Sequence, residues 1–274
     1  MSRIEKAIER ANILRELEKD KEATKKTVPQ PTPNIKAGVS VKVNNPYLVV
    51  INEPFSPAAE EYRKLKSMVV KLTKKGKLQN TIMVTSTAAG EGKTLTALNL
   101  AITLAEEYDH TVLLIDADLR QPSIHRYLGI EPKIGLSDCL SNGTEIGHAI
   151  IKTGIGNLSV VTSGSQVSNP VELLLSNKMK ALVEEMKHRY ADRYIIFDTP
   201  PVLPFAEAHS IGLVVDGVIF VVREGSASIN DIKEALNMLK DTNILGVTYN
   251  DADVSRFNNY YSYMTPYHRL SGKK

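Results

Sequence analysis

Cysteine, long hydrophobic runs and excess charge are all scarce in this sequence of 274 residues. A single cysteine, Cys139, and six histidines leave too little material for a cysteine-rich metal site or a disulfide framework, and they fit a reducing compartment. No apolar run approaches the roughly 18 residues of a membrane span, and the N-terminus, MSRIEKAIER, lacks the apolar core of a signal peptide. The small net charge of +3 argues against nucleic acid as a partner. We therefore expect a cytoplasmic protein that reaches the inner face of the membrane only through a partner.

Residues Thr81–Gln121 contain the most informative motif. An apolar run at 82–84 is followed by the glycine-rich turn Gly90-Glu91-Gly92-Lys93-Thr94 and then by a segment of helical periodicity. A strand, a glycine-rich turn and a helix form the context of a phosphate-binding loop, because glycines let backbone N–H groups approach an oligophosphate closely. The pattern G-x-x-x-x-G-K-[ST] is met except at Thr87, which stands at its first glycine. We predict an N–H cradle from Ala89 to Thr94, with Lys93 at the outer phosphates and Thr94 at Mg²⁺.

Three carboxylates follow apolar runs that are expected to be strands. Asp116 and Asp118 end the run after the predicted loop and helix, and Asp198 ends the run 193–198. Ligand sites gather at the carboxyl ends of parallel strands, so Asp198 can hold magnesium directly or through water. Asp116 and Asp118 are separated by one residue at a strand end, so their side chains point in different directions, and one can face the metal while the other faces an incoming hydroxyl. The alternative, that the carboxylate only caps the next turn, applies more to Asp118 than to Asp116. Arg120 could neutralise a phosphate or orient an acid.

The order of elements predicts an α/β fold with a doubly wound, mainly parallel sheet. Residues 1–26 show the spacing of an amphipathic helix, and residues 27–46 have the composition of a proline-rich linker. We expect residues 47–250 to form the main domain and residues 251–274 to form a tail. Within the domain, Ser56-Pro57 is expected to start a helix, and Asn169-Pro170 to start a single long helix through residue 189.

Two sets of polar residues have a plain explanation from spacing alone. On the helix after Ser56, three charged residues at intervals of three would form a solvated charge stripe: Glu60, Arg63 and Lys66. In the tail, four tyrosines have no helical or strand period to bury them: Tyr260, Tyr261, Tyr263 and Tyr267. A flexible terminus with accessible hydroxyls is the physical expectation for them.

Several segments together resemble one family. VTSTAAGEGKT, VLLIDADLRQP and YIIFDTPPVL resemble the Walker A, Walker A′ and Walker B motifs of the bacterial tyrosine autokinases (BY-kinases) of capsular and exopolysaccharide biosynthesis. EEYRKLKSM resembles their E-x-x-R-x-x-R helix, and SNPVELLLS, VDGVIFVVREG and the tyrosine-rich end extend the resemblance over about residues 47 to 267. The opening MSRIEKAIERA is similar to the start of kinases found with exosortase-linked polysaccharide systems. The resemblance implies a P-loop NTPase fold related to MinD and ParA.

The resemblance also implies roles for particular residues. The implied catalytic residues are Lys93, Asp116, Asp118 and Asp198, and the implied magnesium ligands are Thr94, Asp116 and Asp198. The implied ATP-binding residues are Ala89, Gly90, Glu91, Gly92, Lys93, Thr94, Leu95, Arg120 and Asn250, the last where related ATPases contact the adenine edge. The implied autophosphorylation sites are the four tail tyrosines, modified in trans by a neighbouring subunit of a ring that packs through Glu60, Arg63 and Lys66. A membrane-spanning activator would be a separate polypeptide of the chain-length-determinant type.

The sequence departs from the family pattern at two of these positions. Ala89 stands where the family usually has proline, which affects loop stiffness, and Lys66 replaces an arginine and cannot form its bidentate contact.

Two alternative functions stay open. A MinD- or ParA-like ATPase switch without protein kinase activity shares the fold, but Ala88 stands where those proteins have a signature lysine. A catalytically weak relative acting as an assembly scaffold would bind ATP through the same motifs.

Overall fold

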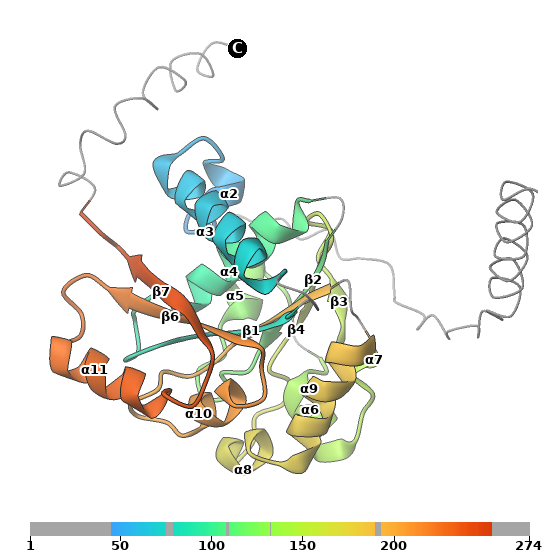
Figure 1. Cartoon of the computed structure of the whole chain (residues 1–274). Coiled ribbons are helices and arrows are strands. Elements are labelled where there is room, and N and C mark those ends of the chain that lie inside the picture. The colour runs from blue at the N-terminus through green and yellow to red at the C-terminus, as the bar shows by residue number, and fades with distance from the viewer. Residues whose placement is uncertain (1–44, 75–78, 108–109, 132, 190–192, 254–274) are drawn as a thin grey trace, which may run out of the picture. The chain divides into compact units, whose positions relative to one another are not determined.

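The computed structural model describes residues 45–74, 79–107, 110–131, 133–189 and 193–253. The predicted N-terminal helix and the four tail tyrosines lie outside these residues. The described strands form one seven-stranded sheet in the order β3-β4-β2-β5-β1-β6-β7 (Figure 1). Their bounds are β1 Thr81–Ser86, β2 Thr111–Asp116, β3 Ile151–Lys152, β4 Leu158–Val161, β5 Arg193–Asp198, β6 Gly217–Arg223 and β7 Ile244–Asn250.

All strand pairs are parallel except that between β3 and β4. Every residue of β1 is buried, as expected of a central parallel strand that is covered on both faces. The predicted doubly wound, mainly parallel sheet is thus confirmed. The short antiparallel strand β3 was not anticipated from the sequence.

One face of the sheet is covered by α2 (Val49–Asn52), α3 (Pro57–Thr73), α4 (Lys93–Ala105) and α5 (Ile124–Leu128), which share one hydrophobic cluster. The helix α4 is the centre of this layer, since eleven of its 13 residues are buried. Asn99 of α4 accepts a hydrogen bond from Val50 N (3.3 Å) and donates one to the carbonyl of Tyr47 (3.1 Å). These bonds fasten the start of the described chain to the central helix.

The predicted start of α3 is confirmed. Ser56 accepts a hydrogen bond from Ala59 N (3.2 Å), and Pro57 is the first residue of the helix. This is the usual arrangement of an N-cap serine followed by proline at a position whose N–H has no intrahelical partner.

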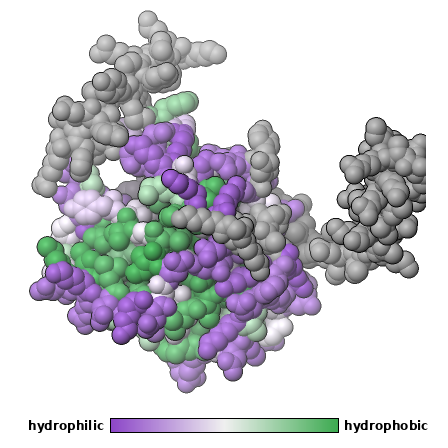
Figure 2. Space-filling view, in the orientation of Figure 1, coloured by the Kyte–Doolittle hydropathy of each residue, from purple (hydrophilic) through white to green (hydrophobic). Residues whose placement is uncertain are grey.

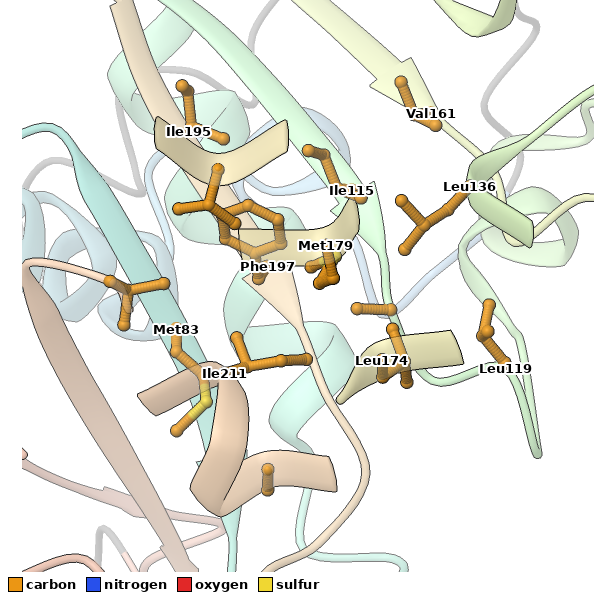
Figure 3. Packing of buried hydrophobic residues seen from close by; sticks show 14 of the residues in the cluster. Met83, Ile115, Leu119, Leu136, Val161, Leu174, Met179, Ile195, Phe197 and Ile211 are labelled. Carbon is orange, nitrogen blue, oxygen red and sulfur yellow. The ribbon is translucent and has the colours of Figure 1, made fainter. Parts of the chain in front are cut away.

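The opposite face is covered by α6 (Leu136–Asn142), α7 (Ile146–Ala149), α8 (Pro170–Leu174), α9 (Asn177–Arg189), α10 (Glu207–Gly212) and α11 (Ile229–Met238). Figure 3 shows part of the cluster they enclose, in which Phe197 and Ile115 of the sheet face Met179 and Leu174. The single helix predicted for residues 170–189 was wrong, because the chain forms two helices there. Ser176 separates them: its hydroxyl donates to Leu173 O (2.7 Å) and accepts from Met179 N (3.2 Å).

The edge strand β7 is less covered than the rest of the sheet. Figure 2 shows hydrophobic surface gathered over β6 and β7, and Val247 is 56% exposed there. None of the described helices combines the length and the apolar character needed to cross a bilayer.

Candidate nucleotide-binding and phosphoryl-transfer site

The turn between β1 and α4 has the backbone shape of a phosphate-binding loop. Gly90 and Gly92 have φ angles of +83° and +89°, in the left-handed region that side chains other than glycine rarely adopt. A Cβ on Gly92 would also collide with the side-chain amide of Asn250 at the end of β7. Gly92 is the N-cap of α4, so Lys93 and Thr94 begin the helix at the place where backbone N–H groups are free to bind an anion.

Glu91 braces this loop from within. Its side chain is fully buried, and its Oε2 accepts a hydrogen bond from Ala88 N (2.7 Å) across the turn. The Glu91 backbone carbonyl accepts a second bond from Asn250 Nδ2 (2.9 Å), which joins the loop to the end of β7. The structure thus places Glu91 and Asn250 at the loop, as contacts that shape it. The resemblance implied that both residues bind ATP, which stays a prediction, and it gave no sign of these contacts within the loop.

The three predicted carboxylates meet at the carboxyl edge of the sheet. Asp116 and Asp198 are directly paired residues of the neighbouring strands β2 and β5. Asp116 Oδ2 accepts from the backbone N–H groups of Ser123 (3.0 Å) and Ile124 (3.1 Å), and so caps the start of α5. The capping expected of Asp118 is present as well, since Asp118 Oδ1 accepts from Gln121 N (3.0 Å). Both residues of the Asp-Ala-Asp motif therefore fix the loop after β2.

Buried oxygens without partners distinguish this cluster from an ordinary structural one. In the described part of the chain, Asp116 Oδ1 and both oxygens of Asp198 are buried without a hydrogen bond of ordinary geometry, although the Thr94 side chain is near enough to lower the pKa of Asp198. Burial, and next the charge of Asp198, raise the pKa of Asp116 to about 8. Burial raises the pKa of Asp198 to about 6 against the opposing charge of Lys93. Buried carboxylates without partners are costly unless a cation or a hydrogen-bond donor joins them.

Lys93 is the cation that the described residues bring to this cluster. Its Nζ lies 2.8 Å from Asp118 Oδ2, and both side chains are largely buried. Burial lowers the pKa of Lys93, but the charges of Asp198, Asp118 and Asp116 outweigh it and the net pKa is raised. Three carboxyl groups around one ammonium supply more acidic oxygens than Lys93 can pair, an arrangement that suits a divalent cation.

Arg120 does not lie free beside the phosphate loop. Its Nε donates to Oε1 of the fully buried Glu207 (2.7 Å), and its guanidinium lies 4.4 Å from the centre of the Phe205 ring. Glu207 and Phe205 were missed by the sequence analysis, because no motif marks them and only the fold brings the segment after β5 to the loop after β2.

The predicted interface residues on α3 have partners within the chain. Arg63 Nη1 lies 2.9 Å from Glu60 Oε2, and Lys66 Nζ lies 2.7 Å from Oε1 of Glu107, which follows α4. The Glu60–Arg63 contact fits the charge stripe that spacing alone suggested, whereas Lys66 pairs with a residue outside that helix. The role of the three residues in a ring stays a prediction.

A mainly parallel sheet with a glycine-rich loop between its central strand and a buried helix, and with acids at the neighbouring strand ends, defines a P-loop nucleoside triphosphatase. A family model described as an AAA domain matches residues 79–245. The chain is 35% identical over 221 residues to the tyrosine-protein kinase YwqD of Bacillus subtilis (strain 168), covering 80% of this chain and 91% of that protein. It is 37% identical over 204 residues to the tyrosine-protein kinase CpsD of Streptococcus pneumoniae serotype 4, covering 73% and 88%. The chain therefore belongs to the bacterial tyrosine-protein kinases.

Solved structures agree with this assignment. The kinase domain of the Escherichia coli tyrosine kinase ETK matches with a TM-score of 0.69 and 29% identity, covering 75% of this chain and 82% of that one. MinD of Pyrococcus horikoshii complexed with Mg-ADP matches with a TM-score of 0.53 and 26% identity, covering 61% and 68%. The ETK kinase domain thus matches over more of this chain than MinD does, and with the higher TM-score.

Proposed function

We propose that this protein-tyrosine kinase transfers the γ-phosphoryl group of ATP to tyrosines in the tail of another copy of itself, with Mg²⁺ as cofactor. The single observation that carries the proposal is the buried Lys93–Asp118 pair, which joins the phosphate loop to the acid after β2. The carboxylate held beside this lysine is a group that can accept the proton of an attacking hydroxyl.

The residues present fit a magnesium ion bound together with nucleotide. Thr94, Asp116 and Asp198 would hold it, since their oxygens converge and three carboxylate oxygens lack partners. Within the described ranges no group of three or more His, Cys, Asp or Glu side chains forms a metal site by itself. Mg²⁺ in phosphoryl-transfer enzymes commonly takes one or two carboxylates and completes its shell with substrate phosphates and water. When bound, it would neutralise charge on the phosphates.

Lys93 and Asp118 would exchange partners when ATP binds. The phosphate oxygens compete for the Lys93 ammonium, which leaves Asp118 Oδ2 free while Oδ1 stays fixed by Gln121 N. Asp118 then accepts the proton of the tyrosine hydroxyl. The phenolic oxygen bonds to the γ-phosphorus as the bond from that phosphorus to the bridging oxygen breaks, and ADP leaves with the electron pair. The backbone N–H groups from Ala89 to Thr94 and Leu95 at the start of α4 would hold the nucleotide.

The acceptors we propose are Tyr260, Tyr261, Tyr263 and Tyr267, reached in trans within a ring that packs through Glu60, Arg63 and Lys66. Each phosphate adds about −1.5 to −2 charge, which would repel the tail from an acidic site and loosen the ring. In this proposal a separate membrane protein activates the kinase at the inner face of the membrane, and the cycle regulates polymerisation and export of a capsular polysaccharide or exopolysaccharide.

The test is a count of phosphotyrosines by mass spectrometry after incubation of the purified full chain with ATP and Mg²⁺, with and without the cytoplasmic segment of its activator. Isotopically labelled Lys93→Met protein serves as the acceptor, so that transfer in trans is separated from self-modification. We expect phosphate on the labelled tail only when active protein is present. ATP hydrolysis without phosphotyrosine under every condition would refute the proposal and favour an ATPase switch.

A further inference from the structure

The carboxyl ends of β6 and β7 lie on the side of the phosphate loop away from the buried carboxylates. In the sheet order, β5 and β2 with Asp198 and Asp116 follow β1 on one side, and β6 and β7 follow it on the other (Figure 1). The terminal phosphate and Mg²⁺ belong on the side of the carboxylates. A nucleotide held by the loop would therefore extend its base toward the ends of β6 and β7, where Arg223 and Asn250 are paired residues.

Asn250 carries hydrogen-bonding groups that can distinguish one purine base from another. Its Nδ2 donates to Glu91 O (2.9 Å), and a Cβ on Gly92 would collide with Nδ2 but lie 3.9 Å from Oδ1. A side-chain amide has one acceptor oxygen and two N–H donors, so the bond to Glu91 leaves Oδ1 and one N–H for a base. Adenine complements this pair with its amino group and N7, whereas a purine with a carbonyl in place of the amino group would set an acceptor against Oδ1.

Arg223 and Asp251 hold the end of β7 against the end of β6. Arg223 Nε and Nη2 both donate to Asp251 Oδ2, at 2.9 and 2.7 Å. Among the described residues, Asp251 is the one other than glycine with a positive φ, at +55°, so the backbone turns directly after Asn250. Glu224 N donates to Asn250 O (3.0 Å) and joins the same two strand ends through the backbone. The residue that carries the amide is thus held from both sides.

The end of β6 is also joined to the phosphate loop. Arg223 N lies 3.5 Å from Glu91 Oε1, at the outer limit of a hydrogen bond, and the other oxygen of this buried carboxylate accepts from Ala88 N. The backbone of Arg223 therefore faces the loop, while its side chain fixes the turn after Asn250. Both contacts determine where the amide of Asn250 lies relative to the phosphates.

The Arg223–Asp251 pair is poorly suited to stabilise the fold. Its side chains are 48% and 61% exposed, and exposed ion pairs contribute little to stability because water screens their charges and ordering them costs entropy. The left-handed backbone of Asp251 is itself unfavourable for a residue other than glycine, and such conformations concentrate at functional sites. The exposure and the backbone both favour a role in positioning.

We propose that Arg223 and Asp251 are positioning residues that set the purine specificity of this kinase by fixing the side-chain amide of Asn250 against the base. Adenine is the purine whose edge this amide complements, and the pair prevents the turn after β7 from moving the amide away from it. The inference rests on the nucleotide binding of the proposed function, and it adds the residues that select the base.

The test compares binding of ADP and IDP to the full-length protein with Mg²⁺ by isothermal titration calorimetry. The two ligands differ at one edge of the base, which carries an amino group in ADP and a carbonyl in IDP, and neither supplies a γ-phosphoryl group. Arg223→Met removes the donors and keeps an unbranched side chain, and Asp251→Asn removes the charge with a residue that tolerates a left-handed backbone. Arg189→Met is the matched control, since Arg189 pairs with Glu185 at similar exposure and precedes β5, at the amino edge of the sheet.

We expect the unaltered protein to prefer ADP over IDP by at least about tenfold. Arg223→Met should reduce this preference to about threefold or less through weaker binding of ADP, with the affinity for IDP within about twofold of the unaltered protein. Asp251→Asn should act in the same direction. The double variant should lose no more than Arg223→Met alone, because the two residues act as one pair. Arg189→Met should keep the full preference.

The results that overturn the inference are distinct from those that overturn the proposed function. An equal loss of affinity for ADP and IDP in Arg223→Met would show that the pair acts on the phosphate loop and not on the base, and an unchanged preference in both single variants would show that it positions nothing. A protein that loses its preference in the variants but forms no phosphotyrosine with ATP would refute the kinase and support the role of the pair. Failure to bind either diphosphate would refute both.

Discussion

Replacing Asp198 by asparagine should stabilise the nucleotide-free protein while it removes kinase activity. The side chain is fully buried beside Asp116, and neither of its oxygens has a hydrogen bond of ordinary geometry among the residues described. Its charge is therefore a cost of folding that only a bound cation would offset. The asparagine side chain would keep the shape of the aspartate and remove its charge.

The size of the gain follows from the pKa. Burial raises the pKa of Asp198 from 3.8 to about 6, a change of roughly two units, and each unit corresponds to about 1.4 kcal/mol. The ionised form thus lowers the free energy of unfolding by about 3 kcal/mol, of which the unpaired amide of asparagine would take back a part. We expect a net gain of about 1–3 kcal/mol, or roughly 3–10 °C in Tm for a domain of this size.

The gain should depend on pH in a defined direction. A carboxyl group with a raised pKa binds its proton more tightly in the folded state, so the wild-type protein loses stability as pH rises from about 4 to about 6. The difference between Asp198→Asn and wild type should therefore be small near pH 4 and grow as pH rises through about 6.

The assay is urea unfolding followed by circular dichroism, without nucleotide, at about pH 4.5 and about pH 8. Asp138→Asn is the matched control, because the hydrogen bonds from Ser165 and Gly135 lower the pKa of Asp138 even though burial alone would raise it. That variant should be less stable than wild type at the higher pH. The reasoning is refuted if Asp198→Asn is also less stable there.

Three further results are expected. Gly92→Ala should weaken ATP binding at least about tenfold by calorimetry, since Gly92 has a φ of +89° and the left-handed conformation costs other residues about 1–3 kcal/mol. Gly143→Ala is the control: Gly143 has a φ of +71° in open space, and its replacement should leave ATP binding unchanged. Burial raises the pKa of Cys139 from 9.0 to about 11, so iodoacetamide at about pH 8 should alkylate the folded protein about a hundredfold more slowly than the unfolded chain, and equal rates would contradict this. Arg120→Ala should lower the free energy of unfolding by about 3 kcal/mol because it leaves Glu207 buried and unpaired, and adding Glu207→Gln should restore at least part of the loss in a urea titration.

Local chemistry made much of the site predictable. The roles of Gly90 and Gly92 are evident from the local sequence, since a left-handed turn before a helix needs glycine at defined positions. Lys93 follows this turn directly and was identified with it. The acids at 116 and 198 were predictable because an apolar run marks each strand, and parallel strands end at one edge.

What escaped prediction depends on contacts between distant segments. The Arg120–Glu207 pair joins residues 87 positions apart, and nothing in either neighbourhood indicates the other. The break between α8 and α9 had a local signal, because Ser176 is a good N-cap, but the leucine-rich pattern around it outweighed that signal. Leu175, beside Ser176 at that break, is 40% exposed.

The internal hydrogen bond of Glu91 bears on how the phosphate loop is stiffened. Where Ala89 replaces the proline usual in the family, no ring restrains the backbone, and the bond from Ala88 N to the buried Glu91 carboxylate ties the turn together instead. A covalent ring restrains the chain in every state, folded or unfolded, whereas this tether exists only once the core has closed around it. The shape of the phosphate loop therefore depends on the folded core around Glu91 and not on a restraint that the chain carries by itself.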